Sequence, residues 1–233
     1  MAALKIPKVI TVPPTGKHTA TFFFFHGSGG SANEIKQYVD ILNRKEFKFP
    51  HIKVVYPNAP EQPYTPLGGM LSNVWFDRKA ITHKAPEVKE SIDQICKATS
   101  ELIDKEIDNG VPINRIIIGG FSMGGTLSMH LAYRYKTSLA GCVVASSFLN
   151  DNSLVYEHLK SIDGEIKLPP MLQFHGLADM MVPFSWGTAT RENLENNGVK
   201  IDLIKLPGVE HELVRSEIEK LNNWLVEKLP ENI

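Results

Sequence analysis

The chain lacks the features that mark disulfide-rich, membrane-spanning or nucleic-acid-binding proteins. Its two cysteines, Cys96 and Cys142, form neither a disulfide framework nor paired CxxC metal-binding knuckles. Its 25 Lys and Arg residues nearly balance 26 Asp and Glu residues without a basic cluster, whereas binding to nucleic acids or anionic membranes depends on such clusters. The longest apolar block, residues 22–25, is far too short to cross a bilayer.

Targeting and lipidation signals are also missing. The first five residues lack the apolar core of a signal peptide. Ala2 stands where a myristoylation site needs glycine. We therefore expect a protein of the reducing cytosol, with no stable membrane anchor and no nucleic-acid partner.

The length and composition predict one α/β domain spanning residues 1–233. A chain of 233 residues with 42% hydrophobic residues can bury a single large core. Strand-like and helix-like runs alternate along it, which is typical of a central, mostly parallel sheet with helices on both faces. Six buried strands are predicted, over residues 21–25, 52–56, 115–118, 141–145, 171–174 and 201–206.

Three helices are predicted from periodicity and end signals. The capping-box pattern Ser31-Ala32-Asn33-Glu34 predicts a helix that begins near Ala32. Residues 86–108 place their apolar side chains on one face and stop at Asn109-Gly110, and residues 212–228 have the pattern of a closing helix. The stretch 57–77 is long for a connection, so we expect it to be functional.

The sharpest chemical signal is Gly120-Phe121-Ser122-Met123-Gly124. It directly follows the strand-like run 116–118 and directly precedes a helical run, which is the context of a nucleophile elbow. The alternative is a glycine-rich turn with an ordinary serine, and the strand-turn-helix context disfavours it. Ser122 is therefore the predicted nucleophile.

A serine nucleophile needs a histidine base oriented by an acid. In this architecture the order along the chain is serine, then acid, then histidine. His211, in a loop after the last predicted strand, is the histidine that leaves room for a preceding acid. Asp179, which follows the strand at 171–174, is the preferred acid, and Asp151 is the alternative.

Two backbone amides are expected to bind the oxyanion. One belongs to Met123, directly after the nucleophile, and the other to Ser28, in the glycine-rich loop after the first predicted strand. Residues 27–32 also match a dinucleotide-binding pattern, but the acid that such a site needs is missing from the next strand. No H-E-x-x-H helix or Cys/His cluster occurs, so neither a cofactor nor a metal is expected.

These motifs together resemble the acyl-protein thioesterase and lysophospholipase family of α/β-hydrolases. The resemblance runs essentially end to end, and the Gly-Phe-Ser-Met-Gly-Gly and His-Gly-Ser-Gly sequences are most similar to its lysophospholipase-like branch. It implies an α/β-hydrolase fold and hydrolysis of acyl esters and thioesters, including S-acyl cysteine on proteins, by Ser122, Asp179 and His211. The matching segments lie at residues 24–29, 56–60, 73–77, 118–125, 175–179 and 211–213.

The sequence departs from the better-known thioesterases of that family at several positions. Met123 and Ser28 stand where those enzymes carry Gln and Leu, and Ala2 and Ala3 cannot be acylated like the N-terminal cysteine of those enzymes. The lysophospholipase-like branch is associated with a shallower site for shorter acyl groups. The resemblance therefore implies an acylated small molecule or an S-acylated protein as substrate, for a monomer or weak dimer.

The predicted acyl-binding wall combines the loop at 64–71 with apolar residues near the site, because an acyl chain needs an apolar lining. Its members are Leu71, Trp75, Phe76 and, after the acid, Pro183. The alternative for Trp75 and Phe76 is that they anchor the long loop to the core. A catalytically weak hydrolase scaffold that acts as a binding protein remains the alternative function.

Overall fold

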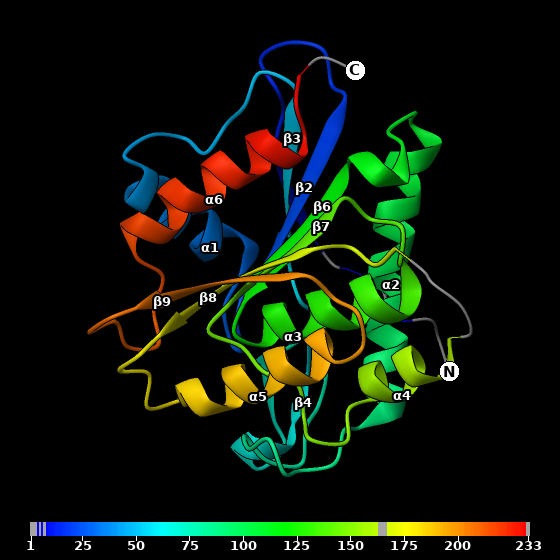
Figure 1. Cartoon of the computed structure of the whole chain (residues 1–233), viewed down its shortest axis with the longest axis vertical. Coiled ribbons are helices and arrows are strands. Elements are labelled where there is room, and N and C mark those ends of the chain that lie inside the picture. Colours follow the sequence, from blue (N-terminus) through cyan, green and yellow to red (C-terminus); the bar gives the residue numbers. More distant parts are fainter. Residues whose placement is uncertain (1–3, 5, 7, 163–166, 232–233) are drawn as a thin grey trace.

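The computed structural model describes residues 4, 6, 8–162 and 167–231. Within them, a seven-stranded sheet runs in the order β1-β3-β2-β6-β7-β8-β9 (Figure 1). Only β1 is antiparallel to its neighbour among these described strands. The strands are β1 (Val9–Val12), β2 (Ala20–Phe25), β3 (Ile52–Pro57), β6 (Ile116–Phe121), β7 (Gly141–Ala145), β8 (Met171–Gly176) and β9 (Ile201–Leu206).

Strand β2 shows why the sheet lies between two apolar layers. Phe22 and Phe24 face one hydrophobic cluster, and Phe23 and Phe25 face the other. A parallel strand covered on both faces has no side for polar residues. The uninterrupted apolar run at 22–25 thus places β2 deep in the sheet, between β3 and β6.

Helices cover both faces of the sheet, as predicted (Figure 1). Residues of α1 and α6 contribute to one cluster, whereas residues of α2, α3, α4 and α5 contribute to the other. The helices are α1 (Ala32–Asn43), α2 (Lys89–Asp108), α3 (Met123–His130), α4 (Leu154–Ser161), α5 (Phe184–Glu195) and α6 (Arg215–Lys228). A π-helical turn over Leu131–Tyr135 extends α3.

The helix starts follow local capping. Helix α1 begins at Ala32 as predicted, because the Ser31 hydroxyl accepts a hydrogen bond from the Glu34 amide. Helix α6 begins at Arg215 rather than at residue 212, since the Glu217 carboxylate accepts from the Val214 amide and fixes the first turn there. Helix α2 likewise begins at Lys89, later than predicted, because Glu87 is paired with Arg78 in an isolated β-bridge and Val88 is not helical.

Two further expectations need correction. Strand β9 is not buried on both faces: it is the edge of the sheet, and Asp202 and Lys205 on it are exposed. The segment at 57–77 is not a plain loop, because β4 (Glu61–Tyr64) and β5 (Met70–Asn73) form a hairpin within it. Gly68 and Gly69 close that hairpin with φ values of 66° and 84°, a conformation that favours glycine.

None of the described helices combines the length and the apolar composition needed to cross a bilayer.

Candidate active site

Ser122 lies at a strained turn between β6 and α3. Its backbone has φ 53° and ψ −120°, a conformation that is unusual for a residue other than glycine. Small neighbours make the turn possible, because a Cβ atom at Gly120 would collide with the Gly124 backbone and one at Gly124 would collide with the Phe25 carbonyl oxygen. The G-x-S-x-G spacing therefore has a steric cause in this fold.

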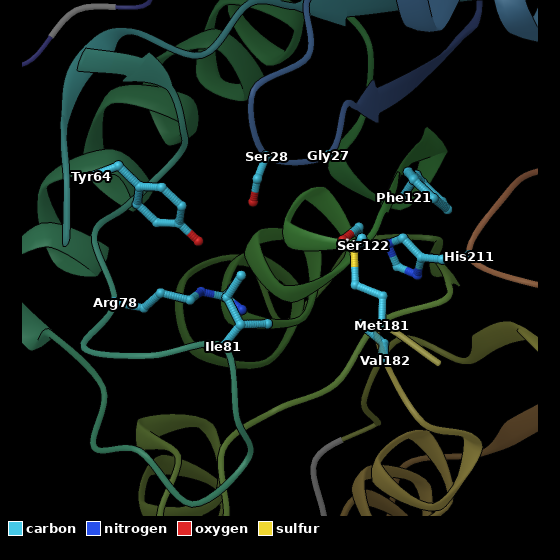
Figure 2. Close-up of a pocket in the computed structure, with 10 residues that line it drawn as sticks. All are labelled: Gly27, Ser28, Tyr64, Arg78, Ile81, Phe121, Ser122, Met181, Val182 and His211. Carbon is cyan, nitrogen blue, oxygen red and sulfur yellow. Dashed lines mark hydrogen bonds between the residues drawn. The ribbon is translucent and has the colours of Figure 1, made fainter. Parts of the chain in front are cut away.

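His211 and Asp179 meet at Ser122 from two loops. Asp179 follows β8 and His211 follows β9, so both reach the carboxyl edge of the sheet. The His211 Nε2 atom lies 3.0 Å from the Ser122 Oγ atom, and the Nδ1 atom lies 2.7 Å from the Asp179 Oδ2 atom. Figure 2 shows the His211 ring beside Ser122.

The Asp179 carboxylate is fixed by its own backbone environment. It is only 4% exposed, and its Oδ1 atom accepts hydrogen bonds from the Met181 amide at 3.0 Å and the Val182 amide at 2.8 Å. The Oδ2 atom is thus left for His211. A carboxylate there accepts a hydrogen bond from the Nδ1–H group, so the proton stays on Nδ1 and Nε2 is left as the acceptor for the Ser122 hydroxyl proton.

Ser28 and Met123, the two predicted oxyanion-binding residues, lie on neighbouring loops. The Ser28 hydroxyl is 3.6 Å from the Met123 sulfur atom, and Gly27 is so close to Ser122 that an added Cβ would lie 3.3 Å from the Ser122 Cβ. Within the described residues, neither the Ser28 amide nor the Met123 amide donates to a protein group. Both N–H groups are available beside the nucleophile.

Two buried histidines, His26 and His175, hold the loops of the site through hydrogen bonds to backbone groups. The His26 Nε2 atom accepts from the Ala59 amide at 2.9 Å, so its Nδ1–H donates to the Gly27 carbonyl at 2.7 Å. The His175 Nε2–H group donates to the Val182 carbonyl at 2.9 Å. Burial lowers the pKa of both imidazoles, which favours the neutral ring in each case.

A cavity of about 260 Å³ adjoins Ser122. Figure 2 shows its walls, which come from the β2 and β6 ends, the hairpin, the segment after it and the loop after Asp179. The lining residues are Gly27, Ser28, Tyr64, Arg78, Ile81, Phe121, Ser122, Met181, Val182 and His211.

None of the four predicted acyl-wall residues lines this cavity. Leu71 is 62% exposed on the hairpin, and Pro183 lies one residue past the lining, before α5. Trp75 and Phe76 are buried in the hydrophobic core. The Trp75 Nε1–H donates to the His26 carbonyl at 2.7 Å, so this ring anchors the long segment behind the site.

The cavity lining is predicted from sequence only in part. Tyr64 belongs to the loop at 64–71 that was predicted to help form the acyl-binding wall, but Arg78, Ile81 and Met181 carried no recognised pattern. The signal available for Arg78 was its position directly after Trp75-Phe76-Asp77. The direction of its side chain, into the cavity, depends on tertiary packing and is not encoded in a short motif.

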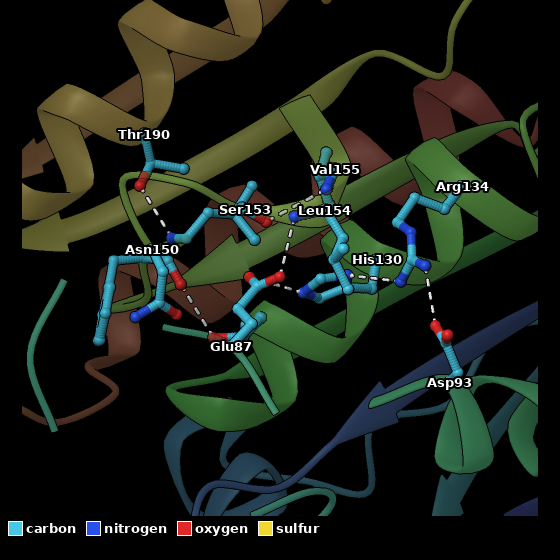
Figure 3. A network of polar contacts seen from close by, with 12 residues as sticks. Glu87, Asp93, His130, Arg134, Asn150, Ser153, Leu154, Val155 and Thr190 are labelled. Carbon is cyan, nitrogen blue, oxygen red and sulfur yellow. Dashed lines mark hydrogen bonds and ion pairs between the residues drawn. The ribbon is translucent and has the colours of Figure 1, made fainter. Parts of the chain in front are cut away.

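A buried polar network ties the segment that contains Glu87 to helices α3 and α4 (Figure 3). The His130 Nε2 atom of α3 lies 3.2 Å from the Glu87 Oε1 atom. The other Glu87 oxygen accepts from the Leu154 amide at 2.9 Å. Burial alone would raise the pKa of Glu87, but His130 and the Leu154 amide outweigh it and the pKa lies below its ordinary value.

Arginine completes this network on its far side. The Arg134 Nη1 atom lies 3.2 Å from the His130 Nδ1 atom and donates to it, which assigns the remaining imidazole proton to Nε2, facing Glu87. The Arg134 Nη2 atom donates to Asp93 at 2.8 Å.

Asp151, the alternative acid, does not contact His211: its Oδ1 atom is 2.7 Å from the His83 Nδ1 atom.

Comparison with known proteins gives consistent matches over nearly the whole chain. A family model described as phospholipase/carboxylesterase matches residues 7–229. The chain is 45% identical to lysophospholipase-like protein 1 of Mus musculus over 229 residues, which are 98% of this chain and 95% of the mouse protein. It is 34% identical to acyl-protein thioesterase 1 of Neurospora crassa over 235 residues, covering 99% of this chain and 95% of the fungal protein.

Solved structures show the same similarity. Arabidopsis thaliana SOBER1 superposes with a TM-score of 0.79 at 25% identity, covering 90% of this chain and 99% of the plant protein. Acyl-protein thioesterase 2 of Zea mays has the same fold, with a TM-score of 0.76 at 24% identity and coverage of 95% and 99%.

Proposed function

Because this chain belongs to the phospholipase/carboxylesterase family, we propose that Ser122, His211 and Asp179 are its nucleophile, general base and orienting acid. The membership confirms the family resemblance, the α/β-hydrolase fold and the serine-hydrolase class expected from the sequence. The assignment of roles to the three residues rests mainly on one observation, the continuous Ser122–His211–Asp179 hydrogen-bonded chain with distances of 3.0 and 2.7 Å.

The chemistry follows from that chain. The Ser122 Oγ atom attacks the acyl carbonyl carbon while the His211 Nε2 atom takes the hydroxyl proton. The Ser28 and Met123 amides donate to the oxyanion of the tetrahedral intermediate. His211 then protonates the departing thiolate or alkoxide, which leaves an acyl ester on Ser122. Water, deprotonated by His211, attacks that ester and releases the carboxylic acid and free Ser122.

The proposed substrates are acyl esters and acyl thioesters with a short acyl group. Pockets for drug-sized ligands hold roughly 300–1,000 Å³, and the cavity beside Ser122, at about 260 Å³, lies below that range. The relatives named acyl-protein thioesterase make an S-acylated protein a candidate substrate beside small-molecule esters. We place this activity in the cytosol, in a monomer or weak dimer that needs no cofactor.

The test measures hydrolysis of p-nitrophenyl esters from acetyl to palmitoyl by the wild-type protein and by Ser122→Ala. We expect activity to peak at short chains and to fall by at least about 10⁴-fold in the variant, because the nucleophile acts only as part of its triad. The matched control is Ser128→Ala. Ser128 is a buried serine of α3 whose hydroxyl donates to the Gly124 carbonyl at 2.8 Å.

Labelling by a fluorophosphonate separates an enzyme from a binding scaffold. The wild-type protein and Ser128→Ala should each take up one label per chain, and Ser122→Ala should take up none, because labelling requires an activated nucleophile. A wild-type protein that neither turns over any ester nor reacts with the probe would contradict the proposal and favour the scaffold.

A further inference from the structure

The cavity beside Ser122 contains an unpaired positive charge. Arg78 lines it, and no acidic residue does among the described residues. The guanidinium carbon lies 5.2 Å from the ring centre of Phe76 and 5.5 Å from that of Phe148. Stacking on aromatic rings stabilises the cation but uses only the faces of the guanidinium, so its N–H groups still require acceptors.

The part of the chain that the structure describes supplies no acceptor for the Nε–H group. The Arg78 Nε atom is buried, and no described carboxylate lies within ion-pair distance of the Arg78 guanidinium. A buried donor without an acceptor is costly, and a charged one more so. The guanidinium can therefore bind an anionic hydrogen-bond acceptor from a ligand.

The two acidic residues nearest in sequence are engaged elsewhere. Asp77 accepts from the Thr65 amide at 2.8 Å and from the Thr65 hydroxyl at 2.6 Å. Glu87, whose backbone pairs with that of Arg78, has its carboxylate between His130 and the Leu154 amide. Both carboxylates are close enough to favour the charged form of Arg78 through space, but neither is joined to it by a hydrogen bond or an ion pair.

Tyr64 adds a second available donor to the same cavity. The residue is only 3% exposed, and its hydroxyl is buried without a hydrogen-bond partner in the described structure. In Figure 2 the Tyr64 hydroxyl and the Arg78 guanidinium both point into the space beside Ser28 and Ser122. Two donors of this kind can bind one carboxylate together.

The position of this pair indicates which part of the substrate it would meet. His211 lies on one side of Ser122, and Tyr64 and Arg78 lie on the other (Figure 2). The leaving group must lie on the His211 side, since His211 protonates it. The acyl group therefore extends towards Tyr64 and Arg78.

We propose that Arg78 and Tyr64 form a subsite for a carboxylate at the far end of a short acyl group. The substrate class is then the monoesters and monothioesters of short dicarboxylic acids. This inference rests on the proposed function, because it uses the same nucleophile and the same cavity. It assigns Arg78 as the residue that determines specificity for an anionic acyl group.

The experiment compares monoesters of glutaric and adipic acid with the uncharged pentanoate and hexanoate esters. Rates are corrected with Ser122→Ala, which also removes the contribution of spontaneous hydrolysis. We expect the wild-type protein to have a higher kcat/KM for the anionic member of each pair. Arg78→Gln should lower this anionic-to-neutral ratio at least tenfold, Arg78→Lys less, and Tyr64→Phe severalfold.

The matched control is Lys79→Gln, which removes a positive charge from an exposed neighbour of Arg78 outside the cavity. It should leave the ratio unchanged, so a general charge effect is distinguished from the subsite. A wild-type protein that cleaves neutral esters without preferring the anionic ones, or a preference that survives in Arg78→Gln, would overturn the subsite and leave the proposed function standing.

A binding measurement decides the subsite without turnover. On the Ser122→Ala background, calorimetry should detect binding of the adipate monoester, and adding Arg78→Gln should raise its Kd at least tenfold. The subsite would be refuted if the Ser122→Ala protein did not bind the adipate monoester, or if adding Arg78→Gln left the Kd unchanged. Failure of all esters as substrates would by itself refute only the proposed function.

Discussion

Replacing Asp179 with asparagine tests the proposed triad at its least exposed member. The Asp179 Oδ1 atom accepts from two backbone amides, at 3.0 and 2.8 Å, so an asparagine would keep its carbonyl oxygen there. Its NH₂ group would then occupy the Oδ2 position, 2.7 Å from the His211 Nδ1 atom. That donor forces Nδ1 to accept and places the imidazole proton on Nε2, where it blocks proton transfer from Ser122.

The magnitude follows from the loss of the correct tautomer. The same substitution in a serine protease triad lowers kcat by about 10⁴-fold, which corresponds to about 5.5 kcal/mol of lost transition-state stabilisation. We expect a similar loss in Asp179→Asn, with stability close to that of the wild type because both amide hydrogen bonds remain. The assay is kcat for p-nitrophenyl butyrate, together with the ¹⁵N spectrum of the His211 ring.

The control for this prediction is Asp151→Asn. Asp151 is the alternative acid, and its carboxylate contacts His83 rather than His211. That variant should stay within about twofold of the wild type, as surface changes usually do. If Asp179→Asn kept more than a tenth of the wild-type kcat, or if its His211 ring showed the wild-type tautomer, the argument from the amide hydrogen bonds would be refuted.

Two further predictions concern stability. Burial raises the pKa of Glu217 to about 7, so the folded state binds a proton at this carboxyl more tightly than the unfolded state does. The stabilisation that comes from this protonated carboxyl is therefore lost as the pH rises from about 5 to 7. Glu217→Gln keeps the acceptor for the Val214 amide and should add about 3 kcal/mol to the free energy of unfolding at pH 8 but little at pH 5. Urea denaturation at the two pH values measures this difference. The control is Glu219→Gln, at an exposed position of the same helix. An equal gain at both pH values would contradict it. Trp75→Phe removes the donor to the His26 carbonyl and should lower the free energy of unfolding by about 1–3 kcal/mol, measured by thermal denaturation. The chain-length profile of ester hydrolysis should not shift. A shifted profile with an unchanged Tm would place Trp75 at the substrate instead.

The parts of the fold that were predictable from sequence are those with local causes. The phenylalanine run predicted a strand covered on both faces, and the Ser31 capping pattern predicted the first residue of α1. The elbow at Ser122 was predictable because glycines are required at fixed spacing by contacts within the turn. The order of acid and histidine along the chain was enough to select residues that the structure brings together.

The cavity lining was not predictable in the same way. Trp75 and Phe76 have the composition of an acyl-binding wall, but they fill the core, and hydrophobicity alone does not distinguish the two roles. Arg78 lines the cavity with its guanidinium stacked on Phe76 and Phe148, which lie 72 positions apart in the sequence. Likewise, β9 has the apolar pattern of a buried strand, but it is an edge strand because it pairs with β8 and with no other described strand.

That edge strand has a consequence for how the protein behaves in a crowded solution. The outer side of β9 is a row of backbone groups able to pair with a strand from another molecule, and such rows are starting points for aggregation. Asp202 and Lys205 are exposed along it. A second strand could pair with β9 only by desolvating these charges. The charged side chains of β9 therefore disfavour edge-to-edge aggregation of a sheet whose inner strands β2 and β6 are rich in phenylalanine and isoleucine.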